Sequence, residues 1–307
     1  MRIVFMGTAE FGIPALRLLL SKQYAIETVV TVPDKPSGRG RKVTESAVRT
    51  FAREQGLTVL QPSSLNDPWF VDTLRKLRPE LFVVVAFRIL PPSVFTIPSF
   101  GAINLHASLL PRYRGAAPIN WAIIRGEKET GVTTFLLEEV VDTGRIILQE
   151  RIGIGEEETA GELHDRLSEL GAGVVLDTVR LIASKRAEPR AQDPALASPA
   201  PKIFRKDCRI DWTAGAVRVH DFIRGLSPKP GAFFHRGETL LKVYRSRMVP
   251  GPGPAPPGTV VSAEGELVVS CGDRALLLAE IQQQGKKPLP VGEFLRGSRI
   301  SRGEVFN

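Results

Sequence analysis

The chain contains few of the residues that build disulfides and metal sites. Its 307 residues include only two cysteines and four histidines. Cys208 and Cys271 lie far apart in the sequence and have no metal-ligand spacing, so we expect no structural zinc site and no other bound metal. So few cysteines also fit a reducing compartment, and we expect a cytoplasmic location.

Long hydrophobic runs are missing as well. No apolar segment is long enough to span a bilayer, and the first residues, MRIVFMGTAEFG, contain neither a long apolar stretch nor a small-residue cleavage pattern. We therefore expect no membrane association and no signal peptide. Hydrophobic residues make up 43% of the chain and charged residues 24%, which is typical of globular proteins, and the length predicts about two domains.

The charge of the chain is unevenly distributed. The formal net charge is +8, and residues 207–307 contain 14 lysines and arginines against 10 acids, compared with 27 against 23 in the first 206 residues. The shorter segment is therefore the more basic per residue, which weakly favours a polyanionic partner for it.

The first half of the chain alternates short apolar segments with helical patterns. The segment LFVVVAF, residues 81–87, is apolar on both faces, as a central parallel strand requires. The alternation predicts a doubly wound, Rossmann-like α/β domain. The predicted strands cover residues 2–7, 26–32, 58–61, 81–87, 101–107, 131–138 and 145–154. The predicted helices cover residues 14–21, 44–55, 118–125 and 159–185, with a further helix starting at Asn66, whose side chain would cap it.

A proline- and alanine-rich stretch separates the two halves. Residues 186–202, RAEPRAQDPALASPAPK, lack periodicity and predict a linker. We therefore expect one domain over residues 1–185, a linker over 186–206 and a second domain over 207–307. After an amphipathic helix at residues 214–226, five short strands predict a small OB-like β-barrel. These strands cover residues 232–234, 239–245, 259–262, 266–270 and 275–281.

The turn after the first strand does not match a nucleotide-binding motif. Residues 7–12, GTAEFG, are not G-x-G-x-x-G, and no P-loop lysine follows. The sequence here predicts a tight strand-to-helix turn rather than a dinucleotide site.

Residues 103–118, INLHASLLPRYRGAAP, contain the main candidate site. Side chains two apart on a strand share a face, so Asn104 and His106 would project together at the carboxyl end of a strand, where open α/β sheets bind ligands. An amide and an imidazole could hold a carbonyl and stabilise the oxyanion formed when a nucleophile adds. The alternative is that both side chains only satisfy backbone groups, and for this pair alone that alternative is favoured.

The neighbouring residues favour a site. Pro111 stiffens the loop, Gly115 permits an unusual backbone angle, and Arg112 and Arg114 could pair with phosphate or carboxylate. Further on, VVDTGR places Asp142 in a loop between two strands, where a carboxylate could orient His106 or move a proton. The alternative for Asp142 is an ordinary turn residue.

These motifs resemble those of the folate-dependent formyltransferases, and the resemblance covers nearly the whole chain. The longer central motif is similar to members that act on initiator methionyl-tRNA. The stretches that carry the resemblance are FMGTAEF, TVPDKPSGRGRK, INLHASLLPRYRGAAPINWAI, GVTTFLLEEVVDTGRII and HDFIRGLSPKPGAFF.

The resemblance implies roles for particular residues. It implies that Asn104, His106 and Asp142 are catalytic and that the segment 108–111 lines the folate site. The implied folate-binding residues are Ser108, Leu109, Leu110 and Pro111, with Arg88 close by. Three positions depart from the common pattern, namely Arg88 where glycine is frequent, Ala9 where proline is frequent, and Arg145 where an acid is common.

The resemblance also implies the reaction. The formyl group of 10-formyltetrahydrofolate would pass to the α-amino group of methionine on initiator methionyl-tRNA, without a metal, and the second domain would help to hold the tRNA. We expect a monomer. The competing hypotheses are a formyltransferase for a small amine, and an RNA-binding protein with a degenerate enzyme domain.

The segment 33–43, PDKPSGRGRKV, predicts a basic loop. A solvated surface loop is the simple interpretation, and the resemblance favours contact with the tRNA acceptor stem. Its candidate tRNA-binding residues are Lys35, Arg39, Arg41 and Lys42. The remaining histidines, His164, His220 and His235, have no partner pattern and are expected to be structural or exposed. Trp212 could be a core residue or an RNA stacking platform, and the core is favoured.

Overall fold

The computed structural model describes residues 1–37, 42–249 and 255–307. These residues form two compact units, each built from separate stretches of the chain. Unit 1 comprises Met1–Gly115, Gly131–Ile152 and His164–Pro199, and unit 2 comprises Ala116–Thr130, Gly153–Leu163 and Ala200–Asn307. The predicted division into residues 1–185, 186–206 and 207–307 is sequential, whereas the compact units are interleaved.

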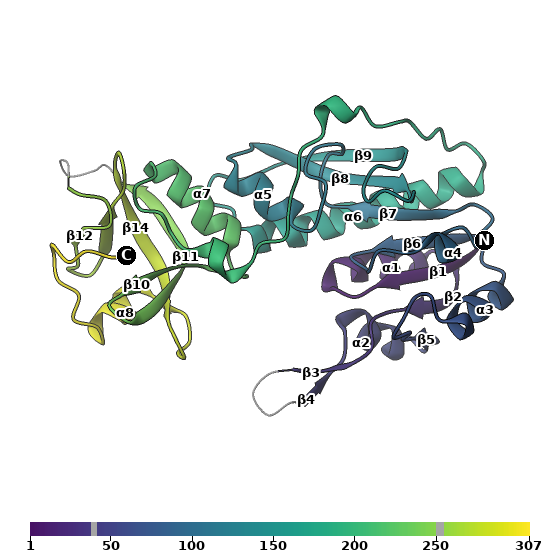
Figure 1. Ribbon diagram of the computed structural model, residues 1–307, viewed down its shortest axis with the longest axis horizontal. Helices are drawn as coiled ribbons and strands as arrows, with labels where there is room; N and C mark the ends of the chain where they lie inside the picture. The colour runs from purple at the N-terminus through teal and green to yellow at the C-terminus, as the bar shows by residue number, and fades with distance from the viewer. Residues whose placement is uncertain (38–41, 250–254) are drawn as a thin grey trace. The chain divides into compact units, whose positions relative to one another are not determined.

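Unit 1 contains a seven-stranded sheet of order β5-β2-β1-β6-β7-β8-β9 (Figure 1). The strands from β5 to β7 are parallel, and β8 runs antiparallel to β7. The chain moves outward from β1 through β2 to β5 and then returns to β6, so the strand order reverses between β1 and β6. The strands are β1 (Arg2–Gly7), β2 (Ala25–Val30), β5 (Val59–Leu60), β6 (Leu81–Val85), β7 (Ala102–His106), β8 (Glu129–Leu136) and β9 (Ile146–Gly153).

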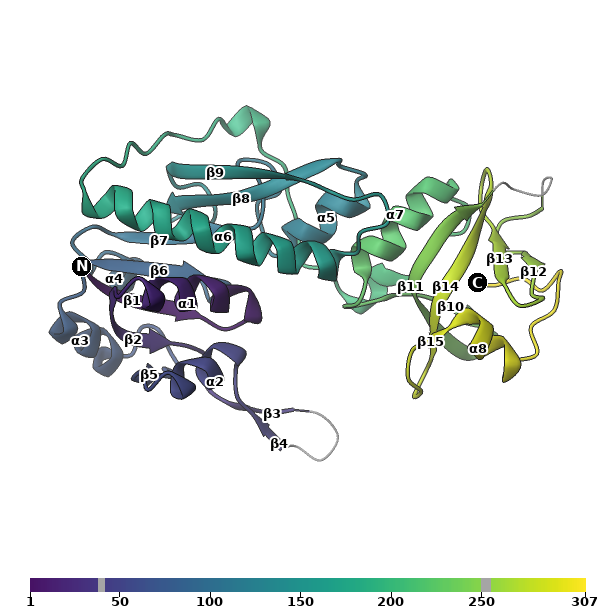
Figure 2. The same cartoon turned by 180° about the vertical axis from the view of Figure 1, so that it is seen from behind.

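Helices cover both faces of this sheet. On one face α1 (Ile13–Ser21) and α6 (Ala160–Ala183) lie along the strands (Figure 2). On the other face, Phe70 and Leu74 of α3 (Pro68–Leu77) belong to a buried cluster with Met6 and Val84 of the sheet. The predicted α/β domain with a parallel sheet is therefore confirmed. The other helices of unit 1 are α2 (Ala47–Glu54), α4 (Pro92–Phe95) and short 3-10 turns at Glu10–Gly12 and Pro194–Leu196.

Local predictions were wrong at two helix starts and in one loop. The N-cap of α3 is Asp67, whose side chain accepts a hydrogen bond from the Trp69 amide at 3.0 Å, and not Asn66. Helix α2 begins at Ala47 after the cap Ser46, three residues later than predicted. Part of the predicted loop 33–43 forms an antiparallel hairpin of β3 (Lys35–Ser37) and β4 (Lys42–Thr44).

Unit 2 contains an antiparallel sheet of order β10-β11-β14-β13-β12, in which β15 pairs with β14. The five predicted strands are confirmed, whereas β15 and the helix after it were missed. Trp212 is 4% exposed and meets Phe234 edge to face in the core, as expected. The strands are β10 (Ala232–Arg236), β11 (Thr239–Val249), β12 (Val260–Ser262), β13 (Leu267–Ser270), β14 (Ala275–Gln283) and β15 (Leu289–Pro290). The helices are α5 (Pro118–Ile124), α7 (Ala216–Leu226), α8 (Val291–Arg296) and a 3-10 turn at Arg205–Cys208.

Among the described residues, no helix combines the length and the apolar content that a membrane span needs.

Candidate active site

Strand β7 presents the two predicted polar residues on one face of the sheet. A Cβ built on Gly171 of α6 would lie 2.6 Å from the Leu105 side chain, so Leu105 packs against that helix. Because side chains alternate along a strand, Asn104 and His106 project from the opposite face. They lie at the carboxyl end of a strand in an open sheet, as the sequence predicts.

A backbone carbonyl fixes the orientation of His106. His106 is 6% exposed, and its Nε2 lies 2.8 Å from the carbonyl oxygen of Tyr113. A carbonyl can only accept, so Nε2 donates and carries a proton. The other nitrogen, Nδ1, lies 3.9 Å from Oδ2 of Asp142. That separation is too long for a hydrogen bond but suits an ion pair with a protonated ring. Tyr113, rather than Asp142, therefore orients the imidazole.

Asp142 lies in a sharply folded loop between β8 and β9, which we call the Asp142 loop (residues 137–145). Asp142 is 9% exposed, and its Oδ2 accepts a hydrogen bond from the Gly115 amide at 2.9 Å. The backbone of Asp142 is left-handed, with φ 58°, which is uncommon for a residue other than glycine. Two residues later, a Cβ on Gly144 would overlap the carbonyl oxygen of Leu136, so only glycine fits there.

The segment 108–111 is tied to the neighbouring strands. Ser108 is fully buried, its hydroxyl donates to the Arg112 carbonyl at 2.6 Å, and its carbonyl accepts from the Thr133 hydroxyl at 2.6 Å. The amide of Leu110 donates to the same Thr133 oxygen at 3.1 Å. These bonds hold the loop that follows β7, which we call the Arg114 loop (residues 107–117), on the sheet.

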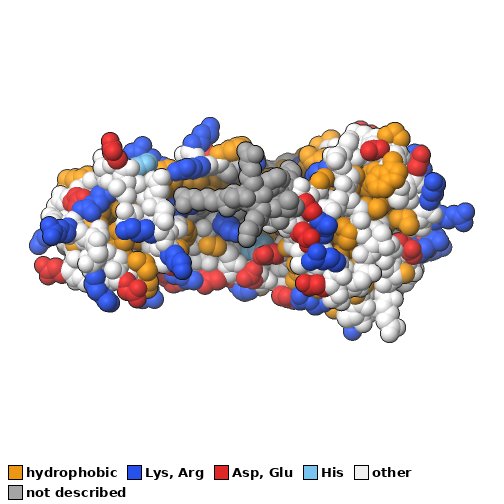
Figure 3. Space-filling model, turned by 90° about the horizontal axis from the view of Figure 1, so that it is seen from below, with side chains coloured by type: hydrophobic (Ala, Val, Ile, Leu, Met, Phe, Trp, Pro, Cys, Tyr) orange, Lys and Arg blue, Asp and Glu red, His pale blue; other side chains and the backbone are white. Residues whose placement is uncertain are grey.

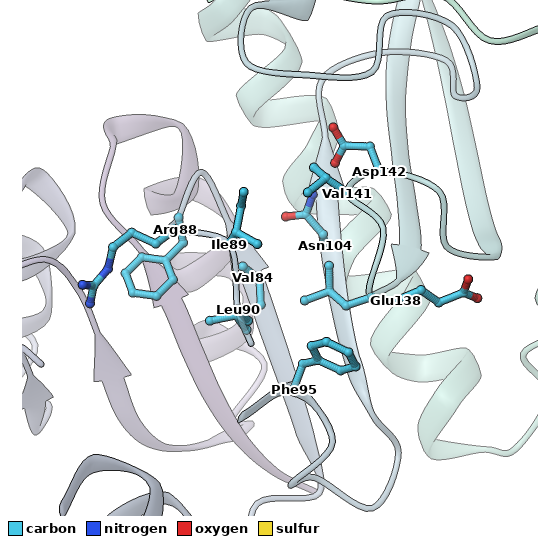
Figure 4. A pocket seen from close by; sticks show the side chains of 11 residues that line it. Val84, Arg88, Ile89, Leu90, Phe95, Asn104, Glu138, Val141 and Asp142 are labelled. Atoms are coloured by element: carbon cyan, nitrogen blue, oxygen red, sulfur yellow. The ribbon is translucent and has the colours of Figure 1, made fainter. Parts of the chain in front are cut away.

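A small cavity of about 100 Å³ opens beside Asn104 and Asp142 (Figure 4). Asn104 comes from β7, and Val141 and Asp142 reach the cavity from the Asp142 loop, opposite Ile89. Its walls are mostly apolar. The lining residues are Val84, Phe87, Arg88, Ile89, Leu90, Phe95, Asn104, Leu137, Glu138, Val141 and Asp142.

Of the predicted folate-binding residues, all of which the structure describes, only Arg88 lies at the cavity. Arg88 is at the cavity, but its side chain points away, and its guanidinium donates to the carbonyls of Pro62 and Ser63 at 2.8 and 3.1 Å. Burial lowers the pKa of this guanidinium. None of Ser108, Leu109, Leu110 and Pro111 is among the described residues that line the cavity.

The sequence did not reveal the apolar walls. Phe87, Ile89 and Leu90 follow β6, and Leu137 follows β8. The sequence feature that could have identified these wall residues is their place directly after β6, a strand buried on both faces. Ligands bind beyond the carboxyl ends of such strands. An open hollow of about 400 Å³ adjoins the cavity and shares Phe95, Leu137 and Glu138 with it.

The predicted tRNA-binding residues cannot be placed at this site. Lys35 lies in β3 and Lys42 in β4, and Arg39 and Arg41 are outside the described residues. Within the described ranges, no group of three or more His, Cys, Asp or Glu residues could hold a metal ion.

Several known proteins are similar in sequence to this chain over nearly its full length. The family described as formyl transferase matches residues 1–179, and the family described as formyl transferase, C-terminal domain, matches residues 202–299. The methionyl-tRNA formyltransferase of Caldanaerobacter subterraneus is 45% identical over 100% of both chains. That of Geobacter sulfurreducens is 44% identical over 99% of this chain and 96% of its own.

Solved structures share the fold. The methionyl-tRNA formyltransferase of Clostridium thermocellum aligns with a TM-score of 0.56 and 18% identity, over 81% of this chain and 94% of its own. HypX from Aquifex aeolicus in complex with tetrahydrofolic acid gives a TM-score of 0.68 at 16% identity. That alignment covers 96% of this chain but 47% of HypX, so the chain spans about half the length of HypX. The family matches and the full-length relatives confirm the resemblance seen in the motifs: the chain belongs to the formyl transferase family.

Proposed function

We propose that the chain transfers the formyl group of 10-formyltetrahydrofolate to the α-amino group of methionine on initiator methionyl-tRNA. Relatives that are 44–46% identical are named methionyl-tRNA formyltransferases, which supports the acceptor. The chemistry is supported by one observation above all: Asn104 and Asp142 face one cavity, and His106 lies 3.9 Å from Asp142.

The cavity suits the reactive end of a folate. Its walls of Phe87, Leu90, Phe95 and Leu137 offer an apolar slot for a flat ring system, and Asn104 supplies an amide at its edge. A whole folate is larger than about 100 Å³, so only its ring end enters, and the adjoining hollow offers room for the remainder.

Asn104 and Asp142 at the cavity, together with His106 beside Asp142, supply the groups that the transfer needs. The amine nitrogen of methionine forms a bond to the formyl carbon, and the carbonyl electrons move to the oxygen to give a tetrahedral oxyanion. Asn104 and His106 donate hydrogen bonds to this oxyanion. Asp142 accepts the proton lost by the amine, and N10 of the folate takes a proton from His106 as its bond to carbon breaks. Return of the proton from Asp142 to His106 restores the site.

The hydrogen bond to Tyr113 determines which form of His106 can act. Nε2 already donates to a carbonyl, so Nδ1 is the nitrogen left to serve the substrate. Nδ1 can donate only when the ring carries both protons, as an imidazolium. The Asp142 carboxylate, 3.9 Å away, balances that charge.

We propose the same functional organisation as the sequence predicts. Residues 1–185 form the catalytic domain, 186–206 a linker whose first part, up to Pro199, packs within unit 1, and 207–307 an OB-like domain that holds the tRNA. Lys35, Arg39, Arg41 and Lys42 contact the acceptor end of the tRNA. The antiparallel sheet and the basic surplus of residues 207–307 support this. Basic and acidic side chains of the described residues are interspersed on the face in Figure 3, so the surplus is spread out there. The enzyme is proposed to act as a cytoplasmic monomer.

An acceptor panel tests the proposal. The protein is incubated with 10-formyltetrahydrofolate and, in separate reactions, charged initiator tRNA, uncharged tRNA, a glycinamide ribonucleotide or an amino sugar. Formyl should appear on the methionine of charged initiator tRNA at a rate far above that on any small amine. Faster transfer to a small amine would contradict the proposed acceptor, and tRNA binding without transfer would favour a degenerate enzyme.

A further inference from the structure

A segment with no recognisable motif lies across both loops of the candidate site. Residues 190–199 pass beside the Asp142 loop and then beside the Arg114 loop, and all three belong to unit 1 apart from the end of the Arg114 loop. Arg190 exchanges backbone hydrogen bonds of 2.8 Å with Ile146, just after the Asp142 loop. At the other end, Ser198 contacts the Arg114 loop. We call residues 190–199 the strap.

Gln192 joins the two loops through one side-chain amide. Its Nε2 donates to the carbonyls of Asp142 and Gly144, at 2.9 and 2.8 Å. Its Oε1 accepts from Nε and from a terminal nitrogen of Arg114, at 3.1 and 2.7 Å. The two donor hydrogens and the acceptor oxygen are all used. The amide has one favourable orientation, because a flip would set the NH2 group against the guanidinium and the oxygen against two carbonyls.

The backbone that Gln192 binds is one that needs support. Asp142 is left-handed, a backbone conformation that a non-glycine residue keeps only where its surroundings enforce it. The Gln192 amide binds the carbonyls on both sides of Thr143, and so fixes the turn from which the Asp142 carboxylate extends.

Ser198 gives the strap a second point of attachment, which leads to His106. The Ser198 hydroxyl accepts from the Tyr113 amide at 2.9 Å, and its carbonyl accepts from the Arg114 amide at 2.9 Å. Tyr113 is also left-handed, with φ 60°, and its carbonyl binds Nε2 of His106. The strap therefore holds the carbonyl that orients the imidazole.

We propose that the strap sets the distance between His106 and Asp142, with Gln192 as the principal positioning residue and Ser198 as the second. The expected effect on kcat rests on the proposed function, whereas the positions of the two loops and the strap do not depend on it. Gln192 acts through the Asp142 backbone and touches neither the formyl group nor the amine.

Isosteric substitution separates the two halves of the Gln192 contact. In Gln192→Glu the side chain still accepts from Arg114, but its second oxygen faces two carbonyls and repels them. We expect kcat to fall roughly 10- to 100-fold in Gln192→Glu and in Gln192→Ala, because small displacements of catalytic groups cost that much. The KM values for folate and tRNA should change by less than about threefold. The control is Leu196→Ala, in the same strap and 62% exposed, which should retain wild-type kinetics.

Two further measurements distinguish positioning from general stability. The pH profile of kcat should change shape in the Gln192 variants, because the separation of carboxylate and imidazole changes, while the thermal unfolding midpoint stays close to that of the wild type. Backbone amide exchange, followed by mass spectrometry, should rise at residues 113–115 and 142–144 in Gln192→Ala and not in Leu196→Ala.

The outcomes are separable from those of the proposed function. If the wild type formylates no tRNA, the proposed acceptor is wrong, and the exchange measurement still decides whether the strap holds both loops. If the wild type is active and Gln192→Glu has its full kcat and an unchanged pH profile, positioning by Gln192 is wrong. Loss of folded protein with unchanged kcat per folded molecule would likewise overturn it and leave a structural role only.

Discussion

Gly144→Ala should impair catalysis severely without touching any catalytic side chain. A Cβ at this position would overlap the carbonyl oxygen of Leu136 and lie 2.9 Å from its carbonyl carbon. Carbon atoms pack at about 3.5–4.0 Å, so the loop must move by at least about 0.6 Å to clear that carbon, and further to clear the oxygen. Asp142 is two residues away and must move with the backbone.

The displacement can be converted into an expected rate. A shift of about 1 Å in a catalytic group costs on the order of 10²-fold in turnover. We therefore expect the single-turnover rate of Gly144→Ala to fall about 10²-fold. The same movement would break the 2.9 Å hydrogen bond from the Gly115 amide to the Asp142 carboxylate. The assay is rapid-quench transfer of labelled formyl at saturating folate and tRNA, with folate binding followed separately by fluorescence.

Gly173→Ala is the matched control. Gly173 lies in α6, and a Cβ there meets nothing within 4 Å, so alanine should stabilise the helix by about 0.5–1 kcal/mol and leave the rate unchanged. A Gly144→Ala enzyme that folds and turns over at the wild-type rate would refute the argument that the Asp142 loop has one permitted backbone path.

Two other predictions concern charge. Arg41→Ala combined with Lys42→Ala should weaken tRNA binding and make the slope of log affinity against log salt shallower by about 0.7–0.9 per lost phosphate contact, while the dissociation constant for folate stays unchanged. Parallel lines for the wild type and the variant in a filter-binding salt titration would show that the segment 33–43 is only a solvated surface. The Thr159 amide, with Arg245, lowers the pKa of Glu162 to about 2, so this carboxylate stabilises the fold above its usual pKa of 4.5, and the contribution is lost as the pH falls toward 2. Glu162→Gln should therefore lose less unfolding free energy than the wild type across that range in urea titrations, and equal losses would contradict the assignment.

Local patterns in the sequence predict the sheet and the strand that bears Asn104 and His106 well. Asn104 and His106 share a strand whose alternation is visible in INLHA, and the burial of residues 81–85 follows from their composition. These features depend on neighbours in the chain, so they can be recognised without knowing the rest of the fold.

Contacts between distant segments could not be predicted in this way. Gln192 binds carbonyls 48 and 50 residues away, and it lies in a stretch whose prolines and lack of periodicity predict a linker. The orientation of His106 depends on the carbonyl of Tyr113, and every residue has such a carbonyl. The apolar residues after β6 become cavity walls only because the Asp142 loop folds beside them.

The central claim is that the pair His106 and Asp142, with Asn104, performs the transfer. It is tested most directly by single-turnover formylation of methionyl initiator tRNA by His106→Ala, with His235→Ala as the control histidine in the second domain. The account predicts a loss of roughly 10²–10³-fold for His106→Ala, with folate and tRNA binding intact, and a wild-type rate for His235→Ala. A His106→Ala enzyme that transfers formyl at the wild-type single-turnover rate would contradict it.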